Sequence, residues 1–449
     1  MDGSPRRLIL SLFCLLYLVA ALAGYARVSR GTLAASGDFH HFYHAAAAMT
    51  EGANIYASGE RGYIYPPLVA FLFQPLAALP LGKAASLWLL VNAALLAGAA
   101  WAAARTAAAR LGTERLKQSA ALAALLGSLL LFDKIRADIR LGQTDGLVIL
   151  PIALALLFLD KRPRLAGLLL GLSGAVKYIS LVFVPYLLLR KRWAAAASTV
   201  FSWIAWMLLP ALSVGWNVNR SYIASALGGF GAMLDPSVGG ARAGAGSAPG
   251  AVAGIAGVVW ERSISLTSAL TRACADHGPL ATYGAVLAAA LACLALGWGL
   301  AWKARVPLWK GRGVPADSQP RLQSVVACEW WGLLAATLLF SPQTTARHFV
   351  LLLPLAVLAG ALWLAAPGRA SRLRLALGAA ILLAGLYLPP AGIPQCLPML
   401  QAWRALGGGS LCLLVFYFVV FHEGLRFSTT QAPPAPRRVL EIEPGTCPP

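Results

Sequence analysis

The chain has 449 residues, of which 59% are hydrophobic and only 12% are charged, and its formal net charge is +20. Ordinary soluble domains carry about 25% charged residues, so this composition excludes a disordered chain and a disulfide-rich scaffold and disfavours a soluble enzyme. The basic residues stand in short clusters between apolar runs rather than along one amphipathic face, so no nucleic-acid partner is expected. The sequence therefore predicts an all-α polytopic membrane protein.

A helix that crosses a bilayer needs roughly 20 apolar residues. Twelve candidate spans follow one another along the chain: 8–28, 83–104, 119–135, 146–160, 165–176, 178–190, 193–213, 278–302, 323–340, 349–366, 373–388 and 401–421. Two of them are half-length and flank Lys177, an interruption that is tolerated where protein or a cavity shields the backbone. The apolar segment 67–80 is interrupted by prolines, so we expect a re-entrant or half-span helix there.

Lysine and arginine set the expected orientation, because cytoplasmic loops are enriched in both. With the N-terminus inside, every tight basic cluster except the one at 134–140 falls on the inner side. This predicts cytoplasmic N- and C-termini, one transmembrane domain over 1–427 and a Pro-rich, disordered cytoplasmic tail over 428–449. The outer side then receives a first loop with interfacial helices, a Gly- and Ala-rich flexible loop at 237–258, and the segments that carry the candidate site residues.

The first outer segment places an acid and several aromatic side chains directly after a span. Asp38 is followed by His41 and Tyr43, and Tyr65 lies in a Tyr-Ile-Tyr-Pro-Pro run. Acidic residues at membrane depth are functional candidates, but an interfacial helix with aromatic anchors and a solvated aspartate is the alternative. Two further histidines, four residues apart, could share a helix face, yet no third ligand stands at a recognised spacing, so no metal is predicted.

The basic cluster at 134–140 lies on the outer side, against the orientation rule. It includes Arg136 and Arg140 and leads into Gln143 and Asp145. Cations held there suit an anionic headgroup or a phosphate. Local pairing with two neighbouring aspartates is the alternative.

Two further cationic positions lie at the outer ends of helices. Lys177, between the two half-length runs, is either a snorkelling side chain or a phosphate ligand. Arg347 and His348 close the segment after the span 323–340, where ordinary helix-end charge is the alternative. We predict that His348 lies near Asp38 in the folded protein.

The sequence lacks the common motifs for nucleotide binding, zinc-dependent proteolysis and serine-hydrolase catalysis. It has no Walker A loop, GxGxxG, HExxH or GxSxG. A sugar-transferring enzyme without a nucleotide-binding domain has to take its activated sugar from the membrane, and no cofactor is predicted. Cys274 and Cys396 could face an oxidising side and pair, which the sequence leaves open.

Together these segments resemble glycosyltransferase family 87, which comprises polytopic enzymes of the GT-C fold. The match runs from about residue 30 to 195 and returns briefly at Ser341-Pro342 and His348. Its pieces are, in chain order, Asp38 with Tyr43 and Ala45-Ala46, Gly52 and Tyr56, Tyr65-Pro66-Pro67-Leu68, Pro75-Leu76, Leu79-Pro80, Trp88, Asn92, Gly142-Gln143, Ala166-Gly167, Lys177 and Leu189-Arg190-Lys191-Arg192-Trp193. Each piece is weak alone, so the resemblance depends on their order and spacing.

The chain departs from the family pattern around the expected substrate cavity. Asp145 stands where the family has Asn, Ser180 replaces a Pro, and Arg347 precedes His348 where the family has a pair of histidines. A family Asn-Gln-Ser-Leu element is reduced to Ser-Ile-Ser-Leu at 263–266. These departures bear on the identity of the sugar and the acceptor more than on the class of reaction.

The resemblance implies transfer of a hexose, commonly mannose, from a polyprenyl-phosphate donor to a lipid or glycan acceptor on the outer face. Asp38 is then the candidate catalytic base. The candidates for binding the donor phosphate or sugar are Lys177, Arg136, Arg140, Gln143, Asp145, Arg347 and His348. His41, Tyr43 and Tyr65 are expected to line the cavity at the interface. A β-linked donor that gives an α-linked product would mean inversion in a single displacement.

Three alternatives stay open. A polyprenyl-phosphate-arabinofuranose transferase would share the fold. A lipid or sugar transporter should bury ionisable groups near the bilayer midplane, whereas here they gather at one face. A scaffold subunit with a decayed site is opposed by the retained Asp38.

Overall fold

The computed structural model describes residues 4–28, 37–58, 63–234, 258–260, 262–304, 320–387 and 398–430. Within these ranges the regular secondary structure is entirely helical, so the predicted all-α class is confirmed. Most of the 237–258 loop and residues 431–449 lie outside the described residues. Cys396 does as well, and with it the suggested pairing with Cys274.

Eight helical stretches among the described residues are long and apolar enough to cross a membrane, which confirms a polytopic membrane protein. They contain the helices α1 (Ser4–Val28), α5 (Leu81–Leu111), α11 (Trp193–Leu208), α15 (Gly278–Lys303), α16 (Pro320–Phe340), α17 (Leu353–Ala365), α18 (Arg369–Tyr387) and α20 (Gly408–Thr430). Shorter apolar stretches accompany them: α4 (Pro67–Ala77), α6 (Glu114–Leu130), α8 (Asp145–Phe158), α9 (Pro163–Val176), and η2 (Tyr178–Val182) with α10 (Phe183–Leu189). The predicted spans fall on the long stretches and on all the short ones except α4, which occupies the expected half-span segment.

Two predicted spans each fall on two separate helical stretches of the structure. The run 119–135 is divided between α6 and a separate charged helix, α7 (Phe132–Leu141). The run 401–421 is divided because Gly407, with a φ of +77°, separates α19 (Pro398–Ala405) from α20. Helix α20 also continues to Thr430, past the predicted start of the tail.

Small residues allow the short helices to pack closely. Gly171 on α9 lies so near α11 that a Cβ added to it would come within 2.5 Å of the Ser202 Cβ. The Ser202 hydroxyl donates to the Leu168 carbonyl at 2.9 Å, which adds a polar contact between the two helices. Without a hydrophobic drive between helices in lipid, such close backbone approach and interhelical hydrogen bonds hold a bundle together.

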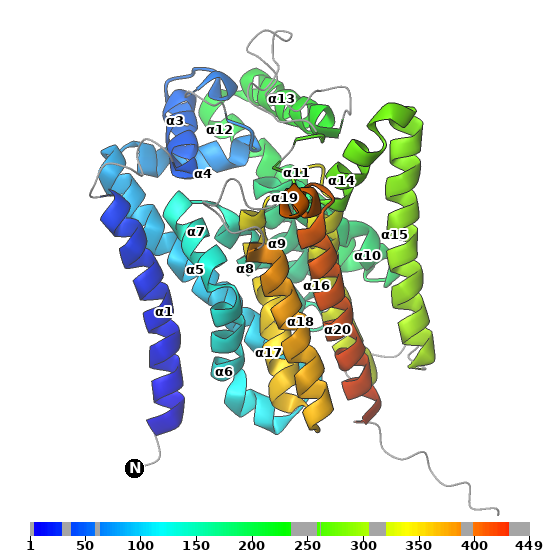
Figure 1. Ribbon diagram of the computed structural model, residues 1–449. Coiled ribbons are helices and arrows are strands. Elements are labelled where there is room, and N and C mark those ends of the chain that lie inside the picture. Colours follow the sequence, from blue (N-terminus) through cyan, green and yellow to red (C-terminus); the bar gives the residue numbers. More distant parts are fainter. Residues whose placement is uncertain are drawn as a thin grey trace, which may run out of the picture.

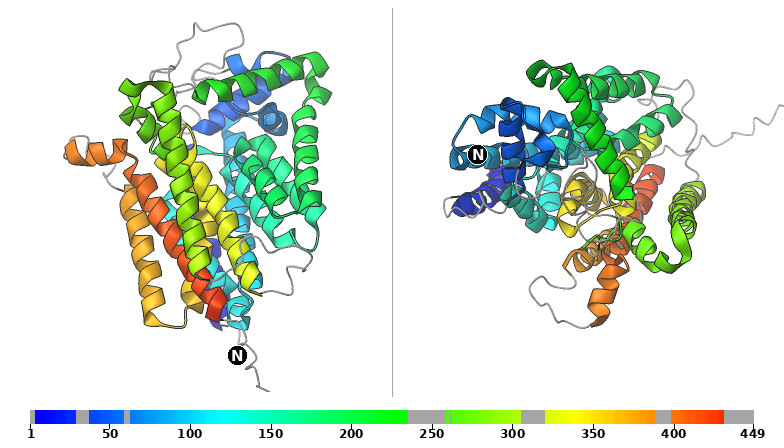
Figure 2. Two further views of the ribbon diagram at one scale, coloured as in Figure 1. Left: turned by 90° about the vertical axis from the view of Figure 1, so that its right-hand side faces the viewer. Right: turned by 90° about the horizontal axis from the view of Figure 1, so that it is seen from above.

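One end of the bundle is covered by α3 (Asp38–Thr50), α4, α12 (Ala211–Val214) and α13 (Trp216–Leu234) (Figure 1). The Tyr222 hydroxyl donates to the Ala53 carbonyl at 2.7 Å and ties α13 to the chain after α3. Helix α3 and the short η1 (Ile55–Ala57) occupy the loop in which interfacial helices are predicted. The start of α1 and the end of α20 both lie at the opposite end (Figures 1 and 2).

Ion pairs join the helices at the end away from α3. Arg110 near the end of α5 pairs at 2.8 Å with Asp160, which follows α8. Arg192, just before α11, pairs with the same carboxylate. Arg190 after α10 pairs with Glu329 of α16. Several basic residues that the sequence predicts for the inner side therefore bind acids of neighbouring helices in the fold.

Candidate functional site

Asp38 begins helix α3, at the covered end of the bundle. Gly37 is the N-cap residue, so the carboxylate sits in the first turn, where the helix dipole favours negative charge. Its Oδ2 accepts a hydrogen bond from Arg347 Nη1 at 3.0 Å and another from Gln143 Nε2. The carboxylate side chain is 23% exposed, so a substrate can still approach it.

A sharp turn at Gly142 brings Gln143 to Asp38. Gly142 ends α7 with a φ of +66°, a left-handed conformation that favours glycine. A Cβ there would lie 2.6 Å from the Phe39 Cβ, so glycine also allows α3 to approach. The Trp88 indole donates to the Gly142 carbonyl at 3.0 Å and fixes the turn against α5.

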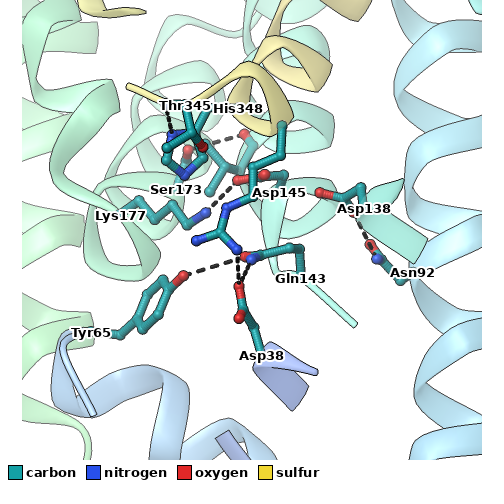
Figure 3. Close-up of polar contacts among 12 residues, drawn as sticks. Asp38, Tyr65, Asn92, Asp138, Gln143, Asp145, Ser173, Lys177, Thr345 and His348 are labelled. Carbon is teal, nitrogen blue, oxygen red and sulfur yellow. Dashed lines mark hydrogen bonds and ion pairs between the residues drawn. The ribbon is translucent and has the colours of Figure 1, made fainter. Parts of the chain in front are cut away.

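The side chain of Gln143 links two parts of the site. Its Nε2 donates to Asp38, and its Oε1 accepts from the Tyr65 hydroxyl at 3.3 Å (Figure 3). These two bonds determine which way the amide faces. Tyr65, Gln143, Asp38 and Arg347 therefore form one continuous chain of hydrogen bonds.

Lys177 and Asp145 form a second ion pair beside this chain (Figure 3). Asp145 is the first residue of α8 and is 1% exposed, and Lys177 is 12% exposed. Lys177 occupies the break between α9 and η2, where its backbone is extended. Its Nζ also lies 5.4 Å from the centre of the Tyr65 ring, which suits a cation–π contact. Tyr65 thus contacts both halves of the site.

Asp138 is a buried acid that the sequence presents only as one of the aspartates next to the basic cluster. It accepts a hydrogen bond from Asn92 Nδ2 at 2.8 Å, and the carboxyl of Asp145 is its other neighbour. Burial raises the pKa of Asp138 well above its usual range, and the negative charge of Asp145 raises it further. A protonated Asp138 can donate to Asp145, which explains how two carboxyl groups lie together.

Arg347 and His348 lie on the 3₁₀ helix η5 (Ala346–Leu352), which precedes α17. The Thr345 backbone N–H donates to His348 Nδ1 at 3.2 Å, so the neutral ring carries its proton on Nε2. The direct partner of Asp38 is Arg347, whereas the His348 ring lies on the side of Lys177 and Asp145 (Figure 3). The structure therefore brings the predicted segments together, with Arg347 rather than His348 touching the acid.

The model of one protein family matches more than half of the chain, residues 63–310. The chain belongs to glycosyltransferase family 87. This confirms the resemblance and makes the protein a membrane glycosyltransferase, as the sequence predicts. Asp38 lies before the matched residues.

Three relatives of this family 87 protein carry related names. It is 28% identical over 360 residues to the polyprenol-phosphate-mannose-dependent alpha-(1-2)-phosphatidylinositol pentamannoside mannosyltransferase of Mycobacterium tuberculosis (strain CDC 1551 / Oshkosh), a match over 76% of this chain and 70% of that protein. The protein of the same name from Mycolicibacterium smegmatis is 28% identical over 65% of this chain and 60% of its own length. A polyprenol-phosphate-mannose-dependent alpha-(1-2)-phosphatidylinositol mannoside mannosyltransferase of Mycobacterium tuberculosis (strain ATCC 25618 / H37Rv) is 29% identical over 47% of this chain and 53% of its own length.

Two basic residues of the predicted cluster on α7 pair with an acid of their own helix rather than with residues of the central site. Arg136 pairs with Asp133 at 2.9 Å, and Lys134 lies 3.4 Å from the same carboxylate. This is the local pairing considered as the alternative. Arg140 is half-buried, and neither it nor Arg136 belongs to the contacts that join Asp38 to Lys177 in the described part of the chain.

The remaining predicted residues lie along α3. The Tyr43 hydroxyl donates to the Leu79 carbonyl at 2.8 Å, so it anchors α3 to the segment after α4. His41 is half-buried on the same helix. The rings of His40 and His44 are 4.1 Å apart. Across the described residues no group of three His, Cys, Asp or Glu side chains is arranged to hold a metal ion.

Proposed function

We propose that this glycosyltransferase moves a mannosyl residue from a polyprenyl-phosphate donor to an acceptor on the extracytoplasmic face, with Asp38 as the catalytic base. The observation that carries the proposal is the chain of contacts from Asp38 through Arg347 and Gln143 to Tyr65, with the Lys177–Asp145 pair beside it. The names of the relatives support a polyprenol-phosphate-mannose donor. The basic clusters at the other end support an extracytoplasmic site with both termini in the cytoplasm.

The reaction needs one base and a group of cations. The acceptor hydroxyl oxygen attacks the anomeric carbon, the bond from that carbon to the phosphate oxygen breaks, and Asp38 takes the hydroxyl proton. The departing polyprenyl phosphate gains one negative charge, which Lys177 and Arg347 can stabilise. Attack opposite the leaving phosphate inverts the anomeric centre in one step.

The neighbouring side chains then have separate tasks. Asp145 holds Lys177 in place for the phosphate, and Tyr65 and Gln143 orient the two halves of the site. The Nε2–H of His348 can donate to a sugar hydroxyl or to the phosphate. Arg136 and Arg140 remain predicted contacts for the anionic lipid headgroup, at the edge of this arrangement.

The acceptor in this proposal is a lipid-linked glycan. Its support is that the relatives are named for phosphatidylinositol mannosides. A polyprenyl-phosphate-arabinofuranose donor is the second candidate for the same site, and a parallel assay separates the two donors.

The test is a transfer assay with the purified full chain in lipid nanodiscs. Radiolabelled polyprenyl-phosphate mannose or polyprenyl-phosphate arabinofuranose is incubated with phosphatidylinositol mannosides, and the lipid products are separated and counted. We expect mannose transfer that falls by about 100- to 10,000-fold in Asp38→Asn, the usual contribution of a general base. Glu51→Gln, at the other end of α3 and exposed, is the matched control and should transfer normally. Near wild-type transfer by Asp38→Asn would move the base elsewhere, with Asp145 the next candidate.

A further inference from the structure

Arg347 contacts the carboxylate of Asp38, the proposed acceptor of the proton from the acceptor hydroxyl. Its Nη1 is 3.0 Å from Asp38 Oδ2, and Gln143 donates to the same oxygen. An oxygen that already accepts two hydrogen bonds is poorly placed to receive a third donor, the acceptor hydroxyl. In this structure Oδ2 is therefore occupied, and this oxygen must lose a partner before it can take the proton.

Of the two site cations, Arg347 is the one that can move. Lys177 is almost fully enclosed and is paired with the buried Asp145. The Arg347 side chain is 39% exposed, while its Nε is buried and has no hydrogen-bond partner among the described residues. A guanidinium has five N–H donors in a fixed fork and matches phosphate oxygens well. Arg347 thus has unused donors and the freedom to turn toward an incoming phosphate.

During the reaction, negative charge is lost at Asp38 and gained at the phosphate, which is the direction in which Arg347 would move. Before transfer, Asp38 and the donor phosphate each carry one negative charge. After transfer, Asp38 carries the proton and the polyprenyl phosphate carries two negative charges. A cation that moves from Asp38 to the phosphate follows the negative charge from the atom that loses it to the atom that gains it.

We propose that Arg347 is a donor-controlled cap on Asp38. This rests on the proposed function, because it requires a lipid-phosphate donor. Without donor, Arg347 and Gln143 hold the carboxylate. When the donor phosphate binds beside Lys177, Arg347 turns to it, and Oδ2 of Asp38 becomes free to accept the proton of the acceptor hydroxyl. Donor binding therefore prepares the base, because Arg347 contacts Asp38 before the donor binds and the phosphate afterwards.

The test is a double-mutant cycle on phosphate binding, which needs no turnover. Tritiated farnesyl phosphate is the probe, and its binding to the full chain in nanodiscs is measured by equilibrium dialysis, with farnesol and empty nanodiscs as background. Asp38→Asn removes the competitor for Arg347, so it should tighten binding about three- to tenfold, within the range for coupled neighbours. In the Arg347→Gln background the same change should alter binding less than about twofold.

Two outcomes of the double-mutant cycle would overturn the proposal. Equal tightening in both backgrounds would show simple repulsion between Asp38 and the phosphate and would overturn the cap. Unchanged binding in Asp38→Asn would overturn it as well. Arg347→Lys keeps the charge and should keep part of the coupling. Arg347→Met, which also removes the charge, replaces Arg347→Gln if that variant does not fold.

A separate variant distinguishes failure of the cap from failure of the proposed function. Lys177→Ala should weaken farnesyl phosphate binding by about tenfold or more, as loss of a charge-assisted hydrogen bond predicts. If Lys177 matters and the cycle shows no coupling, only the cap is wrong. If farnesyl phosphate binds no better than farnesol to the wild-type protein, the phosphate site itself is wrong, and the cap with it.

Discussion

Removing Lys177 should have two separable effects, one on stability and one on donor binding. In Lys177→Met the carboxylate of Asp145 remains, and at 1% exposure it is shielded from the solvent that could stabilise its charge. Breaking a buried ion pair by removing one partner costs about 3–5 kcal/mol of folding stability. We therefore expect a large fall in the thermal unfolding temperature in detergent, followed by tryptophan fluorescence, together with weaker farnesyl phosphate binding.

The double variant Lys177→Met/Asp145→Leu separates the two effects. Replacing a whole buried pair by apolar residues of similar volume is often neutral or stabilising by about 1–4 kcal/mol. Stability should therefore return in the double variant, while phosphate binding stays weak because the cation is still missing. A double variant as unstable as Lys177→Met would refute the argument from an uncompensated charge. A double variant that binds phosphate normally would remove Lys177 from the donor site.

Asp138→Asn is the control for this argument, because its carboxyl also lies beside Asp145. The raised pKa of Asp138 favours its protonated form in the folded protein, and an amide has the same shape as a protonated carboxyl: in Asp138→Asn the carbonyl can accept from Asn92 and the NH₂ can donate to Asp145. Stability should change little. Between the unfolded pKa of about 4 and the raised pKa of the folded state, the folded protein holds this proton more tightly than the unfolded chain. Stability should therefore fall as the pH rises through this window, and Asp138→Asn should remove that part of the slope.

Two further substitutions test how the site is held. Gly142→Ala should destabilise the protein by about 1–2 kcal/mol because alanine disfavours the left-handed backbone, and by about 1–3 kcal/mol more because the new methyl group crowds Phe39. It should also reduce transfer, because α3 is displaced. Gly112→Ala is the control: its φ is +68° but no atom lies within 4 Å of the added Cβ, so thermal unfolding should show only the backbone cost. Tyr65→Phe keeps the ring near Lys177 but loses the hydrogen bond from the hydroxyl to Gln143, which is worth about 0.5–1.5 kcal/mol. We therefore expect kcat to fall several-fold while donor binding stays nearly unchanged. An equal loss in kcat and in donor binding would contradict the proposed role of Tyr65 in orienting Gln143.

The spans could be predicted because an apolar run is a local property of the chain. The same holds for the interruption at Lys177 and for the half-span helix α4, which begins at Pro67 and ends before Pro80. The pairing of Arg136 with Asp133 could also be read from spacing, because residues three apart share a helix face. The break at Gly407 could not be predicted from the sequence, because a glycine inside an apolar run can adopt either a helical or a positive φ. Only the structure shows that its φ is positive.

The contacts of the site could not be predicted in the same way, because they join distant segments. Arg347 meets Asp38 across 309 residues, and Lys177 meets Asp145 across 32. The sequence shows each of these side chains at the outer end of a helix, but not which cation faces which acid. That choice depends on the turn at Gly142 and on how η5 is placed against α7 and α8, which are tertiary features.

The placement of these residues follows from the helical architecture itself. A spanning helix satisfies its own backbone polar groups except at its ends, so polar side chains that need partners are best accommodated there. Asp38 and Asp145 each begin a helix, where the dipole favours an anion, and Lys177 follows the end of α9, where it favours a cation. The two ion pairs thus balance before any substrate binds. A donor phosphate adds an unmatched negative charge. Lys177 can meet this charge while it is paired with Asp145, and Arg347, at 39% exposure, can leave Asp38 more easily than the enclosed Lys177 can leave Asp145.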